Sequence, residues 1–167
     1  IIVPALHEEF VIAGTLRHLL EQDYGDYEIL VSLCEGDDAT IAEVSRVQAN
    51  HDPGNRVRTV VRSYVKSNKP RQLNAALAVS TGTVIGVVDA EDDVAPQLLT
   101  RVNTLLARTD ADVVQGGVQL MTLGRRVRDW FKVHNVMEYF FWFTSRMFYQ
   151  VRTGFVPLGG NTVFIRR

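Results

Sequence analysis

The sequence predicts an α/β fold, with a mostly parallel sheet and helices on both of its faces. Apolar runs of strand length alternate with stretches of helical spacing over the first 110 residues, which is typical of repeated β-α units. Acidic loops follow three of the runs, as expected where parallel strands end at one edge of a sheet. With 167 residues, 46% of them hydrophobic, the chain has the size and composition of one folded domain.

Four apolar runs predict strands, and a helical pattern follows each of them. The runs cover residues 1–5, 28–34, 57–61 and 83–88. Apolar spacing or good helix formers predict helices over 11–20, 41–47 and 73–78. Pro96 fits the first turn of a fourth helix, and Asp92 or Asp93 is placed to cap it.

The pattern changes beyond residue 110, although no repeat, low-complexity segment or linker marks a boundary. Nine of the fifteen aromatic residues fall between 130 and 149, where the spacing predicts a long helix that is apolar on most sides. Such a helix either packs in a core or forms a surface that faces a membrane or an acceptor. Gly159 and Gly160 allow either a turn or close approach of the backbone to a ligand.

The charge and cysteine content exclude several classes of protein. Eighteen basic and nineteen acidic side chains leave a net charge of -1, so capture of the whole chain by nucleic acid or an anionic membrane is not expected. The single cysteine, Cys34, has no disulfide partner and no zinc-ligand spacing around it, which favours a small core residue and a reducing compartment. No apolar run reaches the ~20 residues that span a bilayer, and no signal-peptide pattern is present, so we expect this chain to be soluble.

Four carboxylates lie within five residues at the end of the fourth apolar run, at Asp89, Glu91, Asp92 and Asp93. Close carboxylates repel by up to about 4 kcal/mol per pair at an effective dielectric constant of about 20, so a neutralising partner is expected. Oxygen ligands suit Mg²⁺ or Mn²⁺ bound together with a diphosphate. Helix capping by the last two residues is an equally open alternative, and both can hold at once.

Basic side chains cluster ahead of the third predicted helix, at Lys66, Lys69 and Arg71. Cations beside a helix N-terminus favour phosphate. Solvated surface residues are the simpler alternative for all three.

Two further sets of residues carry weaker signals. Asp37 and Asp38 could bind a ribose or a base edge, or could form the turn that ends a strand. His7 and His134 have no visible catalytic partners, so we expect neither to be catalytic.

Six short segments resemble a known family, and together they extend over essentially the whole chain. They are Val3-Pro4-Ala5-Leu6-His7-Glu8-Glu9, Leu33-Cys34-Glu35-Gly36-Asp37-Asp38, Lys69-Pro70-Arg71-Gln72-Leu73-Asn74, Val88-Asp89-Ala90-Glu91-Asp92, Val114-Gln115-Gly116-Gly117-Val118 and Leu158-Gly159-Gly160-Asn161-Thr162. In this order they resemble the family 2 inverting glycosyltransferases of the GT-A fold, especially the branch similar to bacterial cellulose synthases. Leu6-His7 stands where the family has Tyr-Asn, and the segment at 114–118 lacks the family's arginine.

The resemblance implies a role for each group of matching residues. Asp89 and Glu91 would bind Mg²⁺ or Mn²⁺. The nucleotide-sugar donor, a UDP-hexose, would contact Pro4, Ala5, Glu8, Glu35, Asp38, Lys69, Arg71 and Asp89. Gln115, Gly159, Gly160 and Asn161 would lie on the acceptor side. A single domain over 1–167 would then divide into a donor-binding part at 1–110 and an acceptor-side part at 111–167.

The implied reaction is direct displacement at the anomeric carbon, with inversion, onto a glycan or glycolipid acceptor. The family's general base lies beyond the Gly-Gly segment, so we expect it after Arg167, in a chain that continues, and we expect the 167 residues alone to be inactive. The whole protein would work at the cytoplasmic face of the cell membrane through segments outside this chain, with no nucleic-acid partner.

Two alternatives are weighed against this interpretation. Sugar nucleotidyltransferases share a related fold, but they usually open with a glycine-rich loop, and residues 4–9 contain no glycine. A non-catalytic nucleotide-sugar-binding domain of the same fold would differ only in residues beyond this chain.

Overall fold

The computed structural model describes residues 1–64, 67–119, 130–155 and 158–167. The chain forms two compact units. The first, called here the sheet unit, comprises Ile1–Val114 and Val163–Arg167, and the second, the aromatic unit, comprises Gln115–Thr162. Lys66 and the basic stretch at 125–128 lie outside the described residues. The expected division of roles at residue 110 concerns function and stays a prediction.

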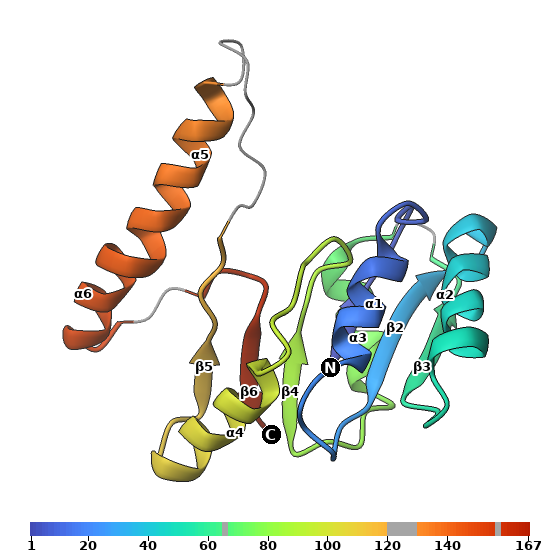
Figure 1. Ribbon diagram of the computed structural model, residues 1–167, viewed down its shortest axis with the longest axis horizontal. Coiled ribbons are helices and arrows are strands. Elements are labelled where there is room, and N and C mark those ends of the chain that lie inside the picture. The colour runs from blue at the N-terminus through green and yellow to red at the C-terminus, as the bar shows by residue number, and fades with distance from the viewer. Residues whose placement is uncertain (65–66, 120–129, 156–157) are drawn as a thin grey trace. The chain divides into compact units, whose positions relative to one another are not determined.

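Six strands form one mixed sheet with the order β3-β2-β1-β4-β6-β5 (Figure 1). They are β1 (Ile2–Pro4), β2 (Ile29–Cys34), β3 (Val57–Arg62), β4 (Val84–Val87), β5 (Val113–Gln115) and β6 (Val163–Arg166). β1 pairs in parallel with β2 and β4, β2 pairs in parallel with β3, and β6 runs antiparallel to β4. The predicted fold class and the four predicted strands, β1 to β4, are confirmed, whereas β5 and β6 were not among the predicted runs.

Helices cover both faces of the sheet, and the alternation of strand side chains shows which helix covers which face. The four helices of the sheet unit are α1 (Ile12–Leu20), α2 (Asp38–His51), α3 (Lys69–Leu77) and α4 (Leu98–Arg108). Val3 and Val31 pack in one cluster with α1 and α2, while Ile2 and Leu30 pack in another with Ala76 of α3. All six residues of β2 are buried, as a central strand covered on both faces requires.

α4 packs on Phe164 of the antiparallel strand β6, and this contact depends on a glycine. Phe164 is paired with Gly86 of β4 and is only 2% exposed. A Cβ at Gly86 would lie 2.5 Å from Cε1 of Phe164, so the glycine leaves the space that the ring fills.

The predicted cap of the fourth helix is wrong. α4 begins at Leu98, after Pro96, and the residue before it, Gln97, makes no side-chain cap. The segment after β4 extends through residue 97, which leaves both aspartates too far upstream to cap the helix. Instead, the backbone N–H of Leu99 donates to Gln22 Oε1 at 3.1 Å.

The aromatic unit contains a helical run made of α5 (Trp130–Phe141), the π-helix η2 (Trp142–Arg146) and α6 (Met147–Arg152). The predicted helix is confirmed, but the wider π turn within it was not predicted. No helix in the described part of the chain has both the length and the apolar character needed to cross a bilayer.

Candidate active site

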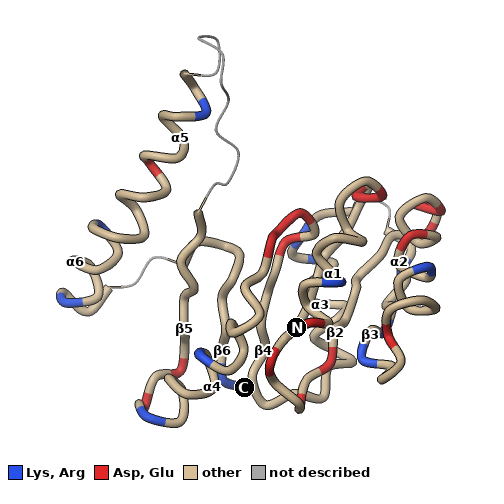
Figure 2. Tube along the Cα trace, viewed as in Figure 1, with Lys and Arg blue, Asp and Glu red and all other residues tan. Residues whose placement is uncertain are grey.

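Acidic residues gather at the edge of the sheet where the parallel strands end, most densely in the loop that follows β4 (Figure 2). A pocket of about 250 Å³ opens at this edge. The residues that line it are Pro4, Leu6, Glu8, Ser67, Asn68, Lys69, Gln72, Asp89, Ala90 and Glu91. The pocket therefore brings together five of the predicted donor and metal residues, which come from the loops after β1 and β4 and from the start of α3.

Lys69 and Asp89 form an ion pair across this pocket. Lys69 is the first residue of α3, and the preceding Asn68 caps the helix by accepting a hydrogen bond from Arg71 N at 3.0 Å. Asp89 follows β4, so a strand end and a helix start hold the two charges together. Both side chains stay partly exposed, at 40% and 25%, which leaves the pair accessible to a ligand.

The site concentrates negative charge. Burial raises the pKa of Glu8, and the neighbouring carboxylates of Glu91, Glu9, Asp37 and Asp89 raise it further. Burial also raises the pKa of Asp92. The negative charges of Asp89 and Glu91 raise this pKa further, and together they have a larger effect than Lys69, which lowers it. Of the described residues that line the pocket, three are acidic and one is basic, which matches the charge of a divalent cation.

The carboxylates in the pocket suit a cation that is held jointly by the protein and by a bound ligand. Within the described ranges, no group of three or more His, Cys, Asp or Glu side chains is arranged to bind a metal by itself. Mg²⁺ is usually held by one or two carboxylates together with substrate phosphates and water. Asp89 and Glu91 supply two carboxylates of that kind beside one pocket.

The acids that follow β2 do not reach this pocket. Asp37 is buried and caps α2, where it accepts hydrogen bonds from Thr40 N and, at 2.8 Å, from His7 N. Burial alone would raise its pKa, but these hydrogen bonds hold the pKa below its usual range. Glu35 and Asp38 are exposed, and neither is among the residues that line the pocket, so their contact with a nucleotide stays a prediction.

Gln72 is a site residue that sequence reasoning missed. Its buried Nε2 lies 3.2 Å from Ala5 O, 3.1 Å from Cys34 Sγ and 3.2 Å from Ser67 Oγ. It therefore connects the ends of β1 and β2 to the segment before α3. Ala5 is buried and takes part in this connection through its backbone carbonyl, and Cys34 is buried as predicted. A glutamine on a short helix has no pattern that marks it as a connector.

The predicted acceptor-side residues form one hydrogen-bonded group within the aromatic unit. Gln115 Oε1 accepts from Gly159 N at 2.8 Å, and Gln115 Nε2 donates to Asn161 O at 2.9 Å. A Cβ at Gly159 would lie 3.1 Å from the Phe143 ring, and Gly160 has a φ of +84°, so each glycine is required by its surroundings or its backbone. Whether this group contacts an acceptor stays a prediction.

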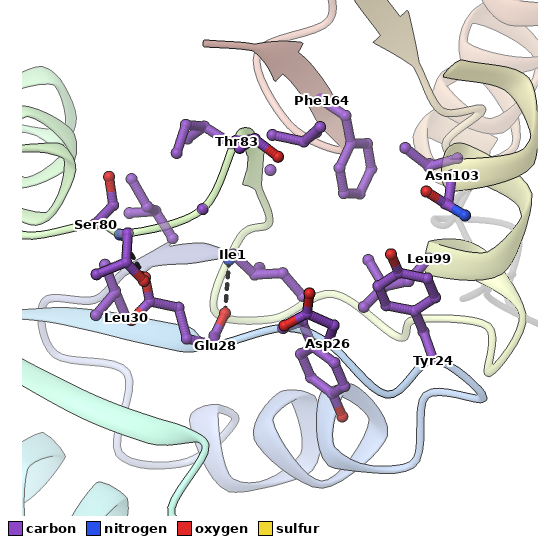
Figure 3. Close-up of a pocket in the computed structure, with 18 of the residues that line it drawn as sticks. Ile1, Tyr24, Asp26, Glu28, Leu30, Ser80, Thr83, Leu99, Asn103 and Phe164 are labelled. Atoms are coloured by element: carbon purple, nitrogen blue, oxygen red, sulfur yellow. Dashed lines mark hydrogen bonds between the residues drawn. The ribbon is translucent and has the colours of Figure 1, made fainter. Parts of the chain in front are cut away.

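A larger pocket, of about 420 Å³, lies at the opposite edge of the sheet, where β1, β2 and β4 begin (Figure 3). Its principal carboxylate, Glu28, is already engaged by Thr81 N and Oγ1, each at 2.7 Å, and by Arg58 Nη1 at 2.6 Å. No Lys or Arg is among the described residues that line it, so it lacks the basic side chains that usually contact a diphosphate. The smaller pocket is the better candidate because it places carboxylates that suit a cation beside a lysine that suits phosphate.

Comparison with known proteins identifies the family. A model of the family described as "Glycosyltransferase like family 2" matches residues 1–167. The chain belongs to glycosyltransferase family 2. Within this family it is 30% identical to the beta-monoglucosyldiacylglycerol synthase of Trichormus variabilis and 29% identical to that of Nostoc sp.. Each alignment covers all of this chain and 35% of the relative, so the chain spans about a third of their length.

Solved structures confirm the GT-A fold of this family 2 chain. A mannosyltransferase from Pyrobaculum calidifontis, in complex with GDP-Man and Mn²⁺, superposes with a TM-score of 0.62 at 28% identity, covering 79% of this chain and 36% of that one. The glucosyl-3-phosphoglycerate synthase of Mycobacterium tuberculosis, in complex with UDP, shares the fold with a TM-score of 0.61 at 16% identity, covering 99% and 55%.

Proposed function

We propose that this family 2 chain binds a nucleotide-sugar donor, a UDP-hexose, with Mg²⁺ or Mn²⁺, for inverting transfer of the sugar to a glycan or lipid-linked acceptor. The observation that carries the proposal is the pocket that joins Lys69, Asp89, Glu91 and Glu8 where the parallel strands end. Ligands of such sheets bind at that edge.

Three charged residues of the pocket have a role in this proposal. Asp89 and Glu91 would hold the cation, which, when bound, would neutralise charge on the leaving diphosphate. Lys69 pairs with Asp89 and stands at the N-terminus of α3, where a cation and backbone N–H groups both favour phosphate. The proposal assigns no general base among these residues.

Relatives support a nucleotide-linked donor, a divalent metal and a lipid-linked acceptor. The Pyrobaculum mannosyltransferase is named as a complex with GDP-Man and Mn²⁺, and the mycobacterial synthase as a complex with UDP. The cyanobacterial relatives are named as glucosyldiacylglycerol synthases, which favours a lipid-linked acceptor. Because such an acceptor lies in a bilayer, we propose that the whole protein works at the cytoplasmic face of the cell membrane.

Calorimetric titration of the chain with UDP, in Mn²⁺ or in chelator, tests the donor site. We expect affinity to fall by about tenfold or more in chelator, which removes the cation that neutralises the diphosphate, and in Asp89→Asn, which removes a carboxylate that would hold this cation. Asp93→Asn is the matched control, since this acid lies in the same loop but pairs with His18 at 3.1 Å outside the pocket. Equal UDP affinity in chelator, or equal losses in both variants, would overturn the proposal.

A further inference from the structure

The aromatic unit exposes an unusual amount of large apolar surface. Eleven of the twenty exposed large apolar side chains among the described residues lie between 130 and 155. They are Trp130, Phe131, Val133, Met137, Tyr139, Phe140, Phe141, Phe148, Tyr149, Val151 and Phe155. Exposed apolar side chains in this number, within one segment, favour an interaction site.

The composition of this segment differs from that of a buried helix. Residues 130–155 contain no Leu and no Ile, although these two residue types supply much of the core of the sheet unit. Ten of the 26 residues are Phe, Trp or Tyr. Trp and Tyr combine an apolar ring with a polar edge and are enriched where a membrane meets water.

The charges of the segment have the sign that an anionic surface attracts. The segment contains three basic residues, Lys132, Arg146 and Arg152, and one acidic residue, Glu138. Its formal charge is therefore +2, whereas the charge of the whole chain is -1. The Arg146 guanidinium lies 4.6 Å from the centroid of the Trp142 ring. A long basic side chain beside an aromatic ring can keep its charge at the headgroups while the ring enters the apolar layer.

We propose that residues 130–155 bind the surface of an anionic phospholipid bilayer and lie along it. Four charged residues divide the run, and it does not qualify as a membrane-crossing helix, so a position in the interface fits better than a crossing one. The proposal extends the proposed function, whose lipid-linked acceptor lies in a bilayer. It can be tested separately, because none of these residues lines the pocket assigned to the donor.

The chain carries its own probe for this test. Its only two tryptophans, Trp130 and Trp142, both lie in the segment. The chain is titrated with vesicles of phosphatidylcholine alone or of equal parts phosphatidylcholine and phosphatidylglycerol, and tryptophan emission and co-sedimentation are measured. We expect a blue shift and binding that are stronger with phosphatidylglycerol and weaker at high salt.

Matched variants separate the aromatic and charged contributions. Phe140→Ser with Phe148→Ser should weaken vesicle binding by about tenfold or more, because both rings lose their lipid contact. The control is Phe10→Ser, which removes a ring that is 92% exposed in the sheet unit. Arg146→Gln with Arg152→Gln should cost about fivefold per charge on the phosphatidylglycerol vesicles, whereas Arg101→Gln on α4 should not.

Three outcomes would overturn the proposal: no binding to either vesicle, equal losses in the control variants, or a blue shift that appears without lipid as protein concentration rises. The last would assign the surface to a second copy of the chain. Far-ultraviolet circular dichroism of every variant checks that the sheet unit is folded, and UDP titration is measured separately. Vesicle binding by a chain that does not bind UDP would refute the proposed function and leave this inference standing.

Discussion

The sheet unit and the aromatic unit differ in how much they bury their apolar side chains. The sheet unit buries Val, Leu and Ile of its strands and helices between its layers, with Leu16, Leu19 and Val31 at 0% exposure. In the described part of the aromatic unit, Met147 is the one large apolar side chain that is buried. The difference indicates that the sheet unit is stabilised by its own core, whereas the described part of the aromatic unit leaves most of its large apolar side chains exposed.

The strongest test of this contrast compares two truncations to alanine. Leu16→Ala should lower the free energy of unfolding by about 3 kcal/mol, because it opens a cavity in a fully buried cluster. Phe140→Ala, at a site 60% exposed, should change it by less than about 0.5 kcal/mol. Urea unfolding followed by far-ultraviolet circular dichroism measures both, and similar losses would show that the aromatic unit has a core of its own.

Two glycine substitutions sharpen the contrast at a smaller expected effect. Gly86→Ala should cost about 1–3 kcal/mol, since its new Cβ would press on the buried ring of Phe164. Gly117→Ala in the aromatic unit meets nothing within 4 Å and should shift the unfolding midpoint little. A destabilised Gly117→Ala, or an unaffected Gly86→Ala, would contradict the packing described here.

The smallest effect concerns Asp37, the buried carboxylate that fixes two loops of the sheet unit. Asp37→Ala should cost about 1–2 kcal/mol at neutral pH, because it removes the cap of α2. The pKa of Asp37 is lowered from its ordinary 3.8, so its contribution is complete above that value and is lost as pH falls through the lower pKa of the folded state.

The unfolding free energies of wild type and Asp37→Ala should therefore converge below pH 3.8. Asp38→Asn, which changes the exposed neighbour, serves as the control and should leave the pH profile unchanged. A constant difference across the acid range would show that Asp37 does not act through its charge.

Much of the sheet unit was predictable because its strands are continuous apolar runs with acidic loops behind them. Glu8 was expected to lie near Asp89 and Glu91 because β1 and β4 end at the same edge of the sheet, and all three line one pocket. Strand β6 was missed because a four-residue run after a glycine segment gives too little pattern to separate a strand from a loop.

Other features depend on contacts between residues far apart in the sequence, which no local pattern records. Asp37 and Asp38 are adjacent residues of the same type. Asp37 is nevertheless buried and caps α2, whereas Asp38 is exposed. The N-terminus of α4 is satisfied by Gln22, which lies 77 residues away from its partner Leu99. Gln72 likewise acquires its role only when the ends of β1 and β2 meet.

The antiparallel return of β6 has a consequence for how this family could be re-engineered. The chain leaves the sheet after β5 and re-enters it at β6, which is the neighbour of β5 in the strand order. Gly116 N donates to Thr162 O at 2.8 Å, so both ends of the intervening segment are joined by a backbone hydrogen bond. Residues 115–162 are thus an insertion with two adjacent junctions, and relatives could exchange this segment as a cassette while keeping the sheet that holds the donor pocket.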